Sequence, residues 1–245
     1  EPLTGLQRVI DVDSLQADDL WPLPDLDDPA PVKPIVARQS DDLAWLFYTS
    51  GTTGRPKGVV LCARQLRGCA LAYLASVQSV QRGDTMLHPA PLSHGGGMYH
   101  LPYVLNAGLN VVPRSDGFDP HEALALAAHW QRASFFAAPT MVRRLVDAAR
   151  TGPERPQGLA TIVYGGGPMY LADIEQALQV IGPHFAQIYG QGECPMTITV
   201  LPAADHFDDH DGRRNRSDDE LVAPDTLVVN DPAGVRASPE KILPL

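Results

Sequence analysis

The chain has 245 residues, 44% hydrophobic and 20% charged, a composition typical of a soluble globular protein long enough to bury a core. Its formal net charge is −10, and the acidic excess lies in the flanks, because residues 1–42 carry a net −7 and residues 205–220 a net −4. We find no cation cluster typical of nucleic-acid binding, no apolar run long enough for a membrane helix and no apolar core of a secretion signal. The three cysteines form no CxxC pair, so we expect a cytoplasmic protein without a disulfide framework.

Changes in composition divide the chain into three regions. Residues 1–42 are an acidic lead-in, and its segment 21–34 holds five prolines, typical of a linker. Residues 43–204 alternate apolar runs with amphipathic stretches and are predicted to hold the folded domain. Residues 205–245 form a polar tail in which 225–230, "DTLVVN", is the one candidate strand.

Within the middle region, apolar runs and helical periodicity alternate along the chain. The predicted strands are 43–48, 85–88, 109–113, 134–138, 160–166 and 185–190. The predicted helices are 63–80, 97–108, 119–131, 139–150 and 171–181. Asp119 and Pro120 are suited to a helix N-terminus, and Gly108 to a helix end. This order predicts an α/β fold with layered, mostly parallel sheets and flanking helices.

The stretch "TSGTTGRPKG", residues 49–58, combines glycines, hydroxyls and two cations directly after the strand predicted at 43–48. Glycines let backbone N–H groups approach a phosphate, hydroxyls can donate to it or meet a metal ion, and Lys57 adds a positive charge. Ligands of α/β folds collect at the carboxyl ends of strands, so we expect a polyphosphate site here. Pro56 precedes the lysine where a Walker A loop has glycine. The alternative is a polar turn that joins two strands.

Four stretches in this order resemble the adenylate-forming superfamily, which contains acyl- and aryl-CoA ligases, peptide-synthetase adenylation domains and luciferases. They are "YTSGTTGRPKG" at 48–58, "PAPLSHGGGM" at 89–98, "YGGGPM" at 164–169 and "QIYGQGECPMT" at 187–197. Together they cover about 43–201. The resemblance implies the large N-terminal domain of such an enzyme, which activates a carboxylic acid with ATP to an acyl-adenylate and then transfers the acyl group to a thiol, usually of coenzyme A.

The resemblance also implies site residues. It implies that the β- and γ-phosphates of ATP are wrapped by Thr49, Ser50, Gly51, Thr52, Thr53, Gly54 and Lys57. It implies that the rest of the nucleotide lies along Gly165, Gly166, Gly167, Tyr189, Gly190, Gln191 and Gly192, with Tyr189 stacked on adenine. Glu193, with Ser50, is the implied ligand of Mg²⁺. The implied catalytic residues are Lys57, Glu193 and His94, and His94 borders the acyl group.

Each of these residues also has a structural interpretation. Glu193 could be a solvated residue of a loop, and Tyr189 could be a core aromatic residue at the end of a strand. Gly165, Gly166 and Gly167 could form a simple turn before the helix at 171, and His94 could be an ordinary loop residue. His88 and His100 lack the spacing of a zinc site.

The acid is expected to lack an α-amine. Residues 85–115 contain no Asp or Glu that could pair a buried ammonium. Residues 95–98, "GGGM", leave space and an adaptable apolar wall, which favours a fatty or other acyl acid.

The sequence departs from the family pattern in two respects. Family members are typically much longer and carry a block before the phosphate loop, which begins here at Thr49. No "TGD" segment, whose aspartate holds the ribose in the family, follows Glu193, and Lys241 does not match the setting of the family's C-terminal lysine. We therefore expect a partial large domain, and two alternatives stay open: a noncatalytic nucleotide-binding remnant, and a half-enzyme completed by another chain.

Overall fold

A computed structural model describes residues 36–49, 56–115, 117–152, 156–206 and 243–244. The chain divides into two compact units, residues 1–38 and 39–245, and every element below lies in the second. None of the helices in the described ranges is long and apolar enough to cross a membrane. The strand predicted at 225–230 lies outside these ranges.

A seven-stranded sheet has the order β4-β3-β5-β6-β7-β8-β9. Its strands are β3 (Thr85–Leu87), β4 (Leu109–Val111), β5 (Ala133–Ala137), β6 (Leu159–Tyr164), β7 (Phe185–Gln191), β8 (Cys194–Leu201) and β9 (Leu243–Pro244). Neighbouring strands from β4 to β7 are parallel, whereas β7–β8 and β8–β9 are antiparallel. The α/β prediction with a mostly parallel sheet is confirmed.

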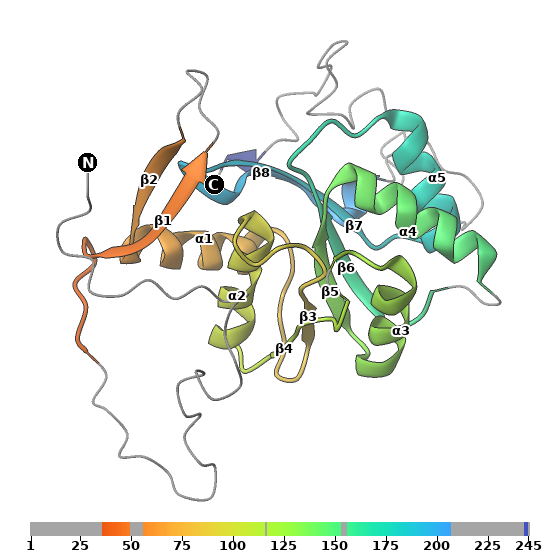
Figure 1. Ribbon diagram of the computed structural model, residues 1–245, viewed down its shortest axis with the longest axis horizontal. Coiled ribbons are helices and arrows are strands. Elements are labelled where there is room, and N and C mark those ends of the chain that lie inside the picture. Colours follow the sequence, from red (N-terminus) through yellow and green to blue (C-terminus); the bar gives the residue numbers. More distant parts are fainter. Residues whose placement is uncertain (1–35, 50–55, 116, 153–155, 207–242, 245) are drawn as a thin grey trace, which may run out of the picture. The chain divides into compact units, whose positions relative to one another are not determined.

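Helical segments cover both faces of this sheet (Figure 1). They are α1 (Ala63–Ser76), η3 (Gly95–Tyr99), α2 (His100–Leu105), α3 (Pro120–Trp130), α4 (Pro139–Thr151), α5 (Leu171–Ile181) and η4 (Ala203–His206). Side chains of α3, α4 and α5 belong to one hydrophobic cluster, and those of α1, α2 and η3 belong to another. Two buried faces explain why the central strands β3, β5 and β6 are mostly apolar.

Successive strand residues supply the two clusters in turn. Leu87 and Ile162 pack with α3, α4 and α5, whereas Met86 and Val163 pack with α1 and α2. This is the alternation of side chains across a pleated sheet. The second cluster also packs against Trp45, Phe47 and Val59, which come from the two strands that precede α1.

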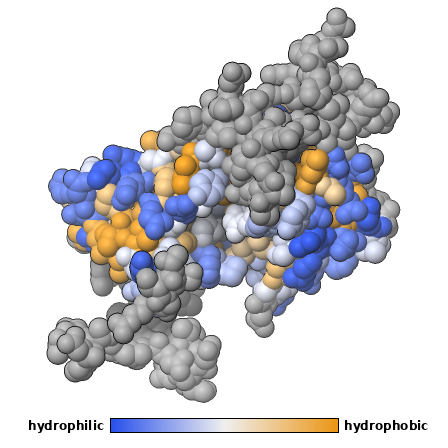
Figure 2. Space-filling model, turned by 90° about the horizontal axis from the view of Figure 1, so that it is seen from above, coloured by the Kyte–Doolittle hydropathy of each residue, from blue (hydrophilic) through white to orange (hydrophobic). Residues whose placement is uncertain are grey.

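Those two strands, β1 (Leu43–Thr49) and β2 (Lys57–Cys62), form a separate antiparallel sheet (Figure 1). The prediction that the phosphate loop follows a strand of the parallel layer is therefore wrong, because β1 pairs with β2 instead. Only one face of the pair packs on the core, and Leu46, Tyr48 and Val60 are exposed on the other. Figure 2 shows apolar side chains gathered at the left, where β1 and β2 lie.

The predicted helices agree with the structure, with two differences at their ends. The helix predicted at 63–80 ends at Ser76. The helix predicted at 97–108 is a 3₁₀ segment followed by a short α2, because glycine is a poor helix former and Pro102 fits only the first turn. Asp119 caps α3 as predicted, and its carboxylate accepts from the N–H groups of His121 and Glu122 at 2.8 and 3.2 Å.

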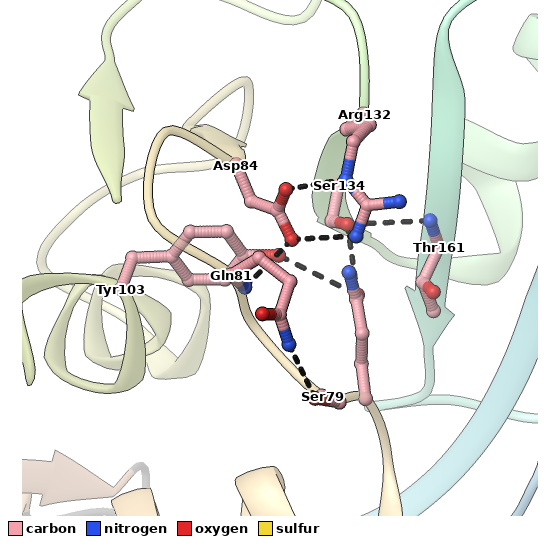
Figure 3. Close-up of polar contacts among 8 residues, drawn as sticks. Ser79, Gln81, Asp84, Tyr103, Arg132, Ser134 and Thr161 are labelled. Atoms are coloured by element: carbon pink, nitrogen blue, oxygen red, sulfur yellow. Dashed lines mark hydrogen bonds and ion pairs between the residues drawn. The ribbon is translucent and has the colours of Figure 1, made fainter. Parts of the chain in front are cut away.

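The amino ends of β3, β5 and β6 are joined by a polar network (Figure 3). The buried carboxylate of Asp84 accepts from Nη2 of Arg132 at 2.9 Å and from the N–H of Gln81 at 2.9 Å. Ser134 accepts from the N–H of Thr161 at 3.2 Å. This network lies at the edge of the sheet opposite to the carboxyl ends, so it supports the strands and does not belong to the site described next.

Candidate functional site

The glycine segment after β6 lies at the carboxyl edge of the sheet, against β7. An ideal Cβ built on Gly165 would lie 2.5 Å from the carbonyl oxygen of Ile188, a contact that only glycine permits. Gly166 has a φ of +77°, in the left-handed region that favours glycine. Gly167 has ordinary space, because its nearest neighbour, Pro139, would be 3.7 Å from a Cβ. Gly165 is buried by its packing on β7, whereas Gly166 is exposed. The segment therefore presents the bare backbone of Gly166 at the edge where α/β proteins bind ligands.

Strand β7 and the tight turn that follows it carry the next group of candidates. Tyr189 is partly buried, and its hydroxyl oxygen accepts from the Gln191 amide. Gln191 pairs with Cys194, so Gly192 and Glu193 form a two-residue turn between β7 and β8. The Glu193 side chain is exposed at this turn, so it is available to a ligand or ion.

The turn packs against the β1–β2 sheet. An ideal Cβ on Gly192 would lie 2.5 Å from Cγ2 of Thr49 and 3.3 Å from Cδ1 of Phe47. The backbone before Glu193 thus lies directly against the end of β1. The structure brings together two candidate segments that are more than 140 residues apart in the sequence.

Thr49 and Lys57 lie opposite each other in the β1–β2 register, at the end of the pair where the connecting loop begins and ends. They bracket the phosphate loop, and Lys57 is exposed. Ser50, Gly51, Thr52, Thr53 and Gly54 lie outside the described residues. The Thr49 end of the loop nevertheless lies beside the Gly192–Glu193 turn.

His94 lies on an exposed loop before η3, and its Nδ1 is 3.1 Å from Oγ of Ser93. No described contact joins it to Lys57 or Glu193, so its predicted role stays a prediction. His100 donates from Nδ1 to the carbonyl of Gly97 at 2.6 Å, a structural contact. His88 contacts Asn110 through Nε2 at 2.8 Å, and burial lowers the pKa of His88.

The donor set at the turn suits a hard cation such as Mg²⁺. The exposed Glu193 offers a carboxylate, and Mg²⁺ in nucleotide sites commonly takes one or two carboxylates together with phosphate oxygens and waters. Among the described residues no group of three or more His, Cys, Asp or Glu side chains forms a complete metal cage. The residues therefore fit an ion that arrives with a nucleotide. The predicted second ligand, Ser50, lies outside the described residues.

One side chain at this edge was missed by the sequence analysis. Phe136 is the penultimate residue of β5, and an ideal Cβ on Gly96 or on Gly166 would lie 3.4 or 3.6 Å from its ring. The ring is only partly buried. Its position just before a strand end was the available signal, but an apolar residue in an apolar strand gave no reason to separate it from the core.

Comparisons with known proteins agree with this arrangement. The AMP-binding enzyme family matches residues 3–236. The chain is 33% identical over 180 residues to a medium/long-chain-fatty-acid–CoA ligase, FadD8, of Mycobacterium tuberculosis, covering 71% of this chain and 30% of that protein. It is 30% identical over 201 residues to a 2-succinylbenzoate–CoA ligase of Bacillus velezensis, covering 78% of this chain and 37% of that protein. The chain thus spans about a third of the length of these relatives.

Solved structures show the same fold. The amide bond synthetase McbA of Marinactinospora thermotolerans matches with a TM-score of 0.62 and 26% identity, over 73% of this chain and 35% of that one. The O-succinylbenzoate coenzyme A synthetase MenE of Bacillus subtilis, in complex with AMP, matches with a TM-score of 0.60 and 27% identity, over 67% and 33%. The match from residue 3 to residue 236 and the shared fold place this chain in the AMP-binding enzyme family, as part of the N-terminal domain of an adenylate-forming enzyme.

Proposed function

We propose that this chain carries the ATP-binding part of an enzyme that activates a carboxylic acid as an acyl-adenylate and then passes the acyl group to a thiol such as that of coenzyme A. The observation that carries the proposal is the packing of Gly192 against Thr49, which is so close that an ideal Cβ on Gly192 would lie 2.5 Å from Cγ2 of Thr49. It holds Glu193 beside the end of the phosphate loop. The family match and the ligase relatives support the reaction class.

In the first step an oxygen of the acid attacks the α-phosphorus of ATP. A bond forms between that oxygen and phosphorus, the bond between the α-phosphorus and its bridging oxygen breaks, and pyrophosphate leaves. In the second step a thiol sulfur attacks the acyl carbonyl, loses its proton to the medium, and AMP leaves. The first step brings a carboxylate to a polyanion, so charge compensation and alignment dominate its barrier.

The chain's own residues can supply both the charge compensation and the alignment that this step requires. Backbone N–H groups between Thr49 and Lys57 are suited to the β- and γ-phosphates, and the Lys57 ammonium offsets their charge. The exposed backbone at Gly166 would let the nucleoside lie close to the sheet edge, next to the Tyr189 ring. Glu193, with Ser50, would hold Mg²⁺, which neutralises phosphate charge when bound. His94 remains the candidate residue near the acyl group.

The test is calorimetric binding of ATP with Mg²⁺ to the wild-type chain and to Lys57→Ala and Glu193→Gln. We expect each variant to bind roughly tenfold or more weakly, because each loses a charge-assisted contact. The matched controls are Arg82→Ala and Asp147→Asn, which remove exposed charges elsewhere and should leave the affinity unchanged. If all four variants bind ATP with Mg²⁺ as tightly as the wild type does, the assignment of this site is refuted.

A second assay separates catalysis from binding. Pyrophosphate release is measured with ATP, Mg²⁺ and a panel of acids. Release supports the ligase function of the chain as it stands. Binding without release for every acid would favour the noncatalytic nucleotide-binding alternative. Release restored by another protein of the family would favour the half-enzyme alternative.

A further inference from the structure

We propose that Phe136 sets the size limit of the acid, so that this chain accepts a compact acyl group, either a short aliphatic chain or a single ring. The proposal rests on the proposed function, because it concerns the acid that reacts at the same site. It narrows the expected fatty or other acyl acid to its compact members.

Phe136 spans the distance between two backbone segments at the sheet edge. On the side of η3, an ideal Cβ on Gly96 would lie 3.4 Å from Cδ1 of the Phe136 ring. On the side of the glycine segment after β6, an ideal Cβ on Gly166 would lie 3.6 Å from Cζ of the same ring. Glycine offers no side chain at either end, so the aromatic ring itself fills the gap. An apolar group that reaches this part of the edge meets the Phe136 ring.

The ring lies on the same side of the main sheet as the β1–β2 pair. Phe136 packs against the hydrophobic cluster of α1 and α2, and so do Phe47 and Val59 of the β1–β2 sheet. The ends of the phosphate loop belong to that same sheet. The acid has to reach the α-phosphate between the phosphate loop and the nucleoside, so its apolar part extends along this face.

Behind Phe136 the interior is filled with aromatic rings. Phe136 stacks on Tyr99 with centroids 5.6 Å apart and planes inclined by 17°. Tyr99 contacts Tyr73 edge to face at 5.5 Å, and Tyr73 contacts Tyr103 at 6.3 Å. The three tyrosines are at most 1% exposed. A long acyl chain directed past Phe136 would have to displace this close-packed cluster, which is costly in a protein interior.

The charge of the surroundings agrees with an uncharged acyl group. Residues 85–115, which include η3 and the loop before it, contain no acidic side chain. A partly exposed phenyl ring between glycines favours an apolar group of limited length over a polar or cationic one.

The test uses sulfamoyl adenosines that carry acetyl, butanoyl, benzoyl, octanoyl or hexadecanoyl groups, with AMP as the acyl-free reference. Their affinities are measured by thermal shift and calorimetry for the wild-type chain, Phe136→Ala and Phe136→Leu. The matched control is Phe118→Ala, which truncates a partly buried ring beside Arg144 in the other cluster. Phe136→Leu serves if Phe136→Ala does not fold.

We expect the wild-type chain to bind the butanoyl or benzoyl analogue roughly tenfold or more tightly than the hexadecanoyl analogue. In Phe136→Ala the preference should move toward octanoyl and hexadecanoyl, and Phe118→Ala should keep the wild-type order. The size limit is overturned if both Phe136 variants keep the wild-type order of analogue affinities, or if the wild type binds the hexadecanoyl analogue most tightly. In either case, binding of AMP would leave the proposed function intact. Failure of AMP and every analogue to bind would overturn the proposed function and this inference together.

Discussion

Gly192 and Thr49 are in direct contact: an ideal Cβ on Gly192 would lie 2.5 Å from Cγ2 of Thr49, so any side chain at this position would force the two segments to shift. The contact joins the turn between β7 and β8 to the end of β1. It couples the mostly parallel sheet, which carries Tyr189 and Glu193, to the small antiparallel sheet that carries the phosphate loop. The candidate site therefore depends on the packing of two sheets and not on one continuous motif.

Gly192→Ala should destabilise the fold by about 1–3 kcal/mol, because the added methyl overpacks the contact with Thr49. The φ of Gly192 is outside the left-handed region, so alanine is not excluded by backbone conformation. Adding Thr49→Ser removes the opposing methyl and should restore part of the loss. Urea unfolding measures both variants. Gly68→Ala, where the nearest heavy atom is beyond 4 Å, is the control and should not destabilise. Identical stability of Gly192→Ala and the wild type would show that the two sheets do not pack in this way.

Gln131→Gly should stabilise the chain by about 1 kcal/mol. Gln131 has φ 59° and ψ 158°, a region that is essentially restricted to glycine. Its N–H donates to the carbonyl of Ala127 at 3.0 Å, and glycine keeps that bond. Thermal unfolding provides the measurement, with Ala128→Gly as the control inside regular helix, where glycine should destabilise. A lower melting temperature for Gln131→Gly would contradict the strained conformation.

Removal of the Arg132 guanidinium should lower the free energy of unfolding by about 1–2 kcal/mol, because it leaves the buried Asp84 carboxylate without its charged partner. This loss is modest because the Arg132 side chain is 61% exposed. Burial alone would raise the pKa of Asp84, but the hydrogen bonds from Arg132 and the Gln81 N–H lower it overall. The pair's stabilisation is therefore present at neutral pH and is lost as pH falls through the folded-state pKa of Asp84.

The measurement is urea unfolding of Arg132→Ala and Arg132→Lys at neutral pH and under acidic conditions. At neutral pH Arg132→Ala should be the less stable, and the difference from the wild type should shrink as Asp84 protonates. A difference that persists unchanged in acid would assign the effect to packing instead of the ion pair.

His206 should make the fold sensitive to mild acid. Burial lowers the pKa of His206 to about 4 from an ordinary 6.5, while the Pro202 carbonyl opposes the shift. Nδ1 donates to that carbonyl at 3.0 Å, and Nε2 accepts from the Tyr164 hydroxyl at 3.1 Å, as in a neutral ring. Between pH 6.5 and 4 this histidine is protonated in the unfolded chain but stays neutral in the folded chain. The free energy of unfolding therefore decreases as the pH is lowered through this window, by roughly 3 kcal/mol for this residue.

Unfolding free energies of the wild type and of His206→Gln at several pH values test this directly. Glutamine does not titrate, so the variant should lose less stability than the wild type on acidification, even if it is less stable at neutral pH. Parallel pH profiles for the two proteins would show that His206 does not provide the sensitivity.

Local patterns were sufficient for most of the elements. Asp119 and Pro120 mark the start of α3, and the five predicted helices and six predicted strands have counterparts in the structure. The antiparallel pairing of β1 with β2 was not predicted, because apolar runs around a glycine-rich loop carry no sign of their partner. Strand β8 was not predicted although "MTITVL" alternates, because Pro195 directly precedes this pattern and is unfavourable in a strand.

The candidate site was predictable only as a set of separate motifs. Residue types pointed to Lys57, and the family resemblance pointed to the Gly165–Gly167 segment and Glu193, but no sequence pattern shows that Gly192 lies against Thr49. That contact depends on long-range packing. Phe136 was overlooked for the same reason, because its neighbours Gly96 and Gly166 are distant in the sequence.

The most direct test of the central claim uses Cys194, which is exposed and directly follows Glu193. Cys62 is buried, and burial with a contribution from Cys194 raises the pKa of Cys69 to about 11, so Cys194 should react first with iodoacetamide. We would measure the alkylation rate of Cys194 by mass spectrometry with and without millimolar ATP and Mg²⁺, in the wild type and in Lys57→Ala. The account predicts that ATP with Mg²⁺ slows alkylation several-fold in the wild type and much less in Lys57→Ala. A Cys194 rate that is the same with and without ATP, at concentrations where calorimetry shows ATP bound, would contradict a nucleotide site formed by these two sheets.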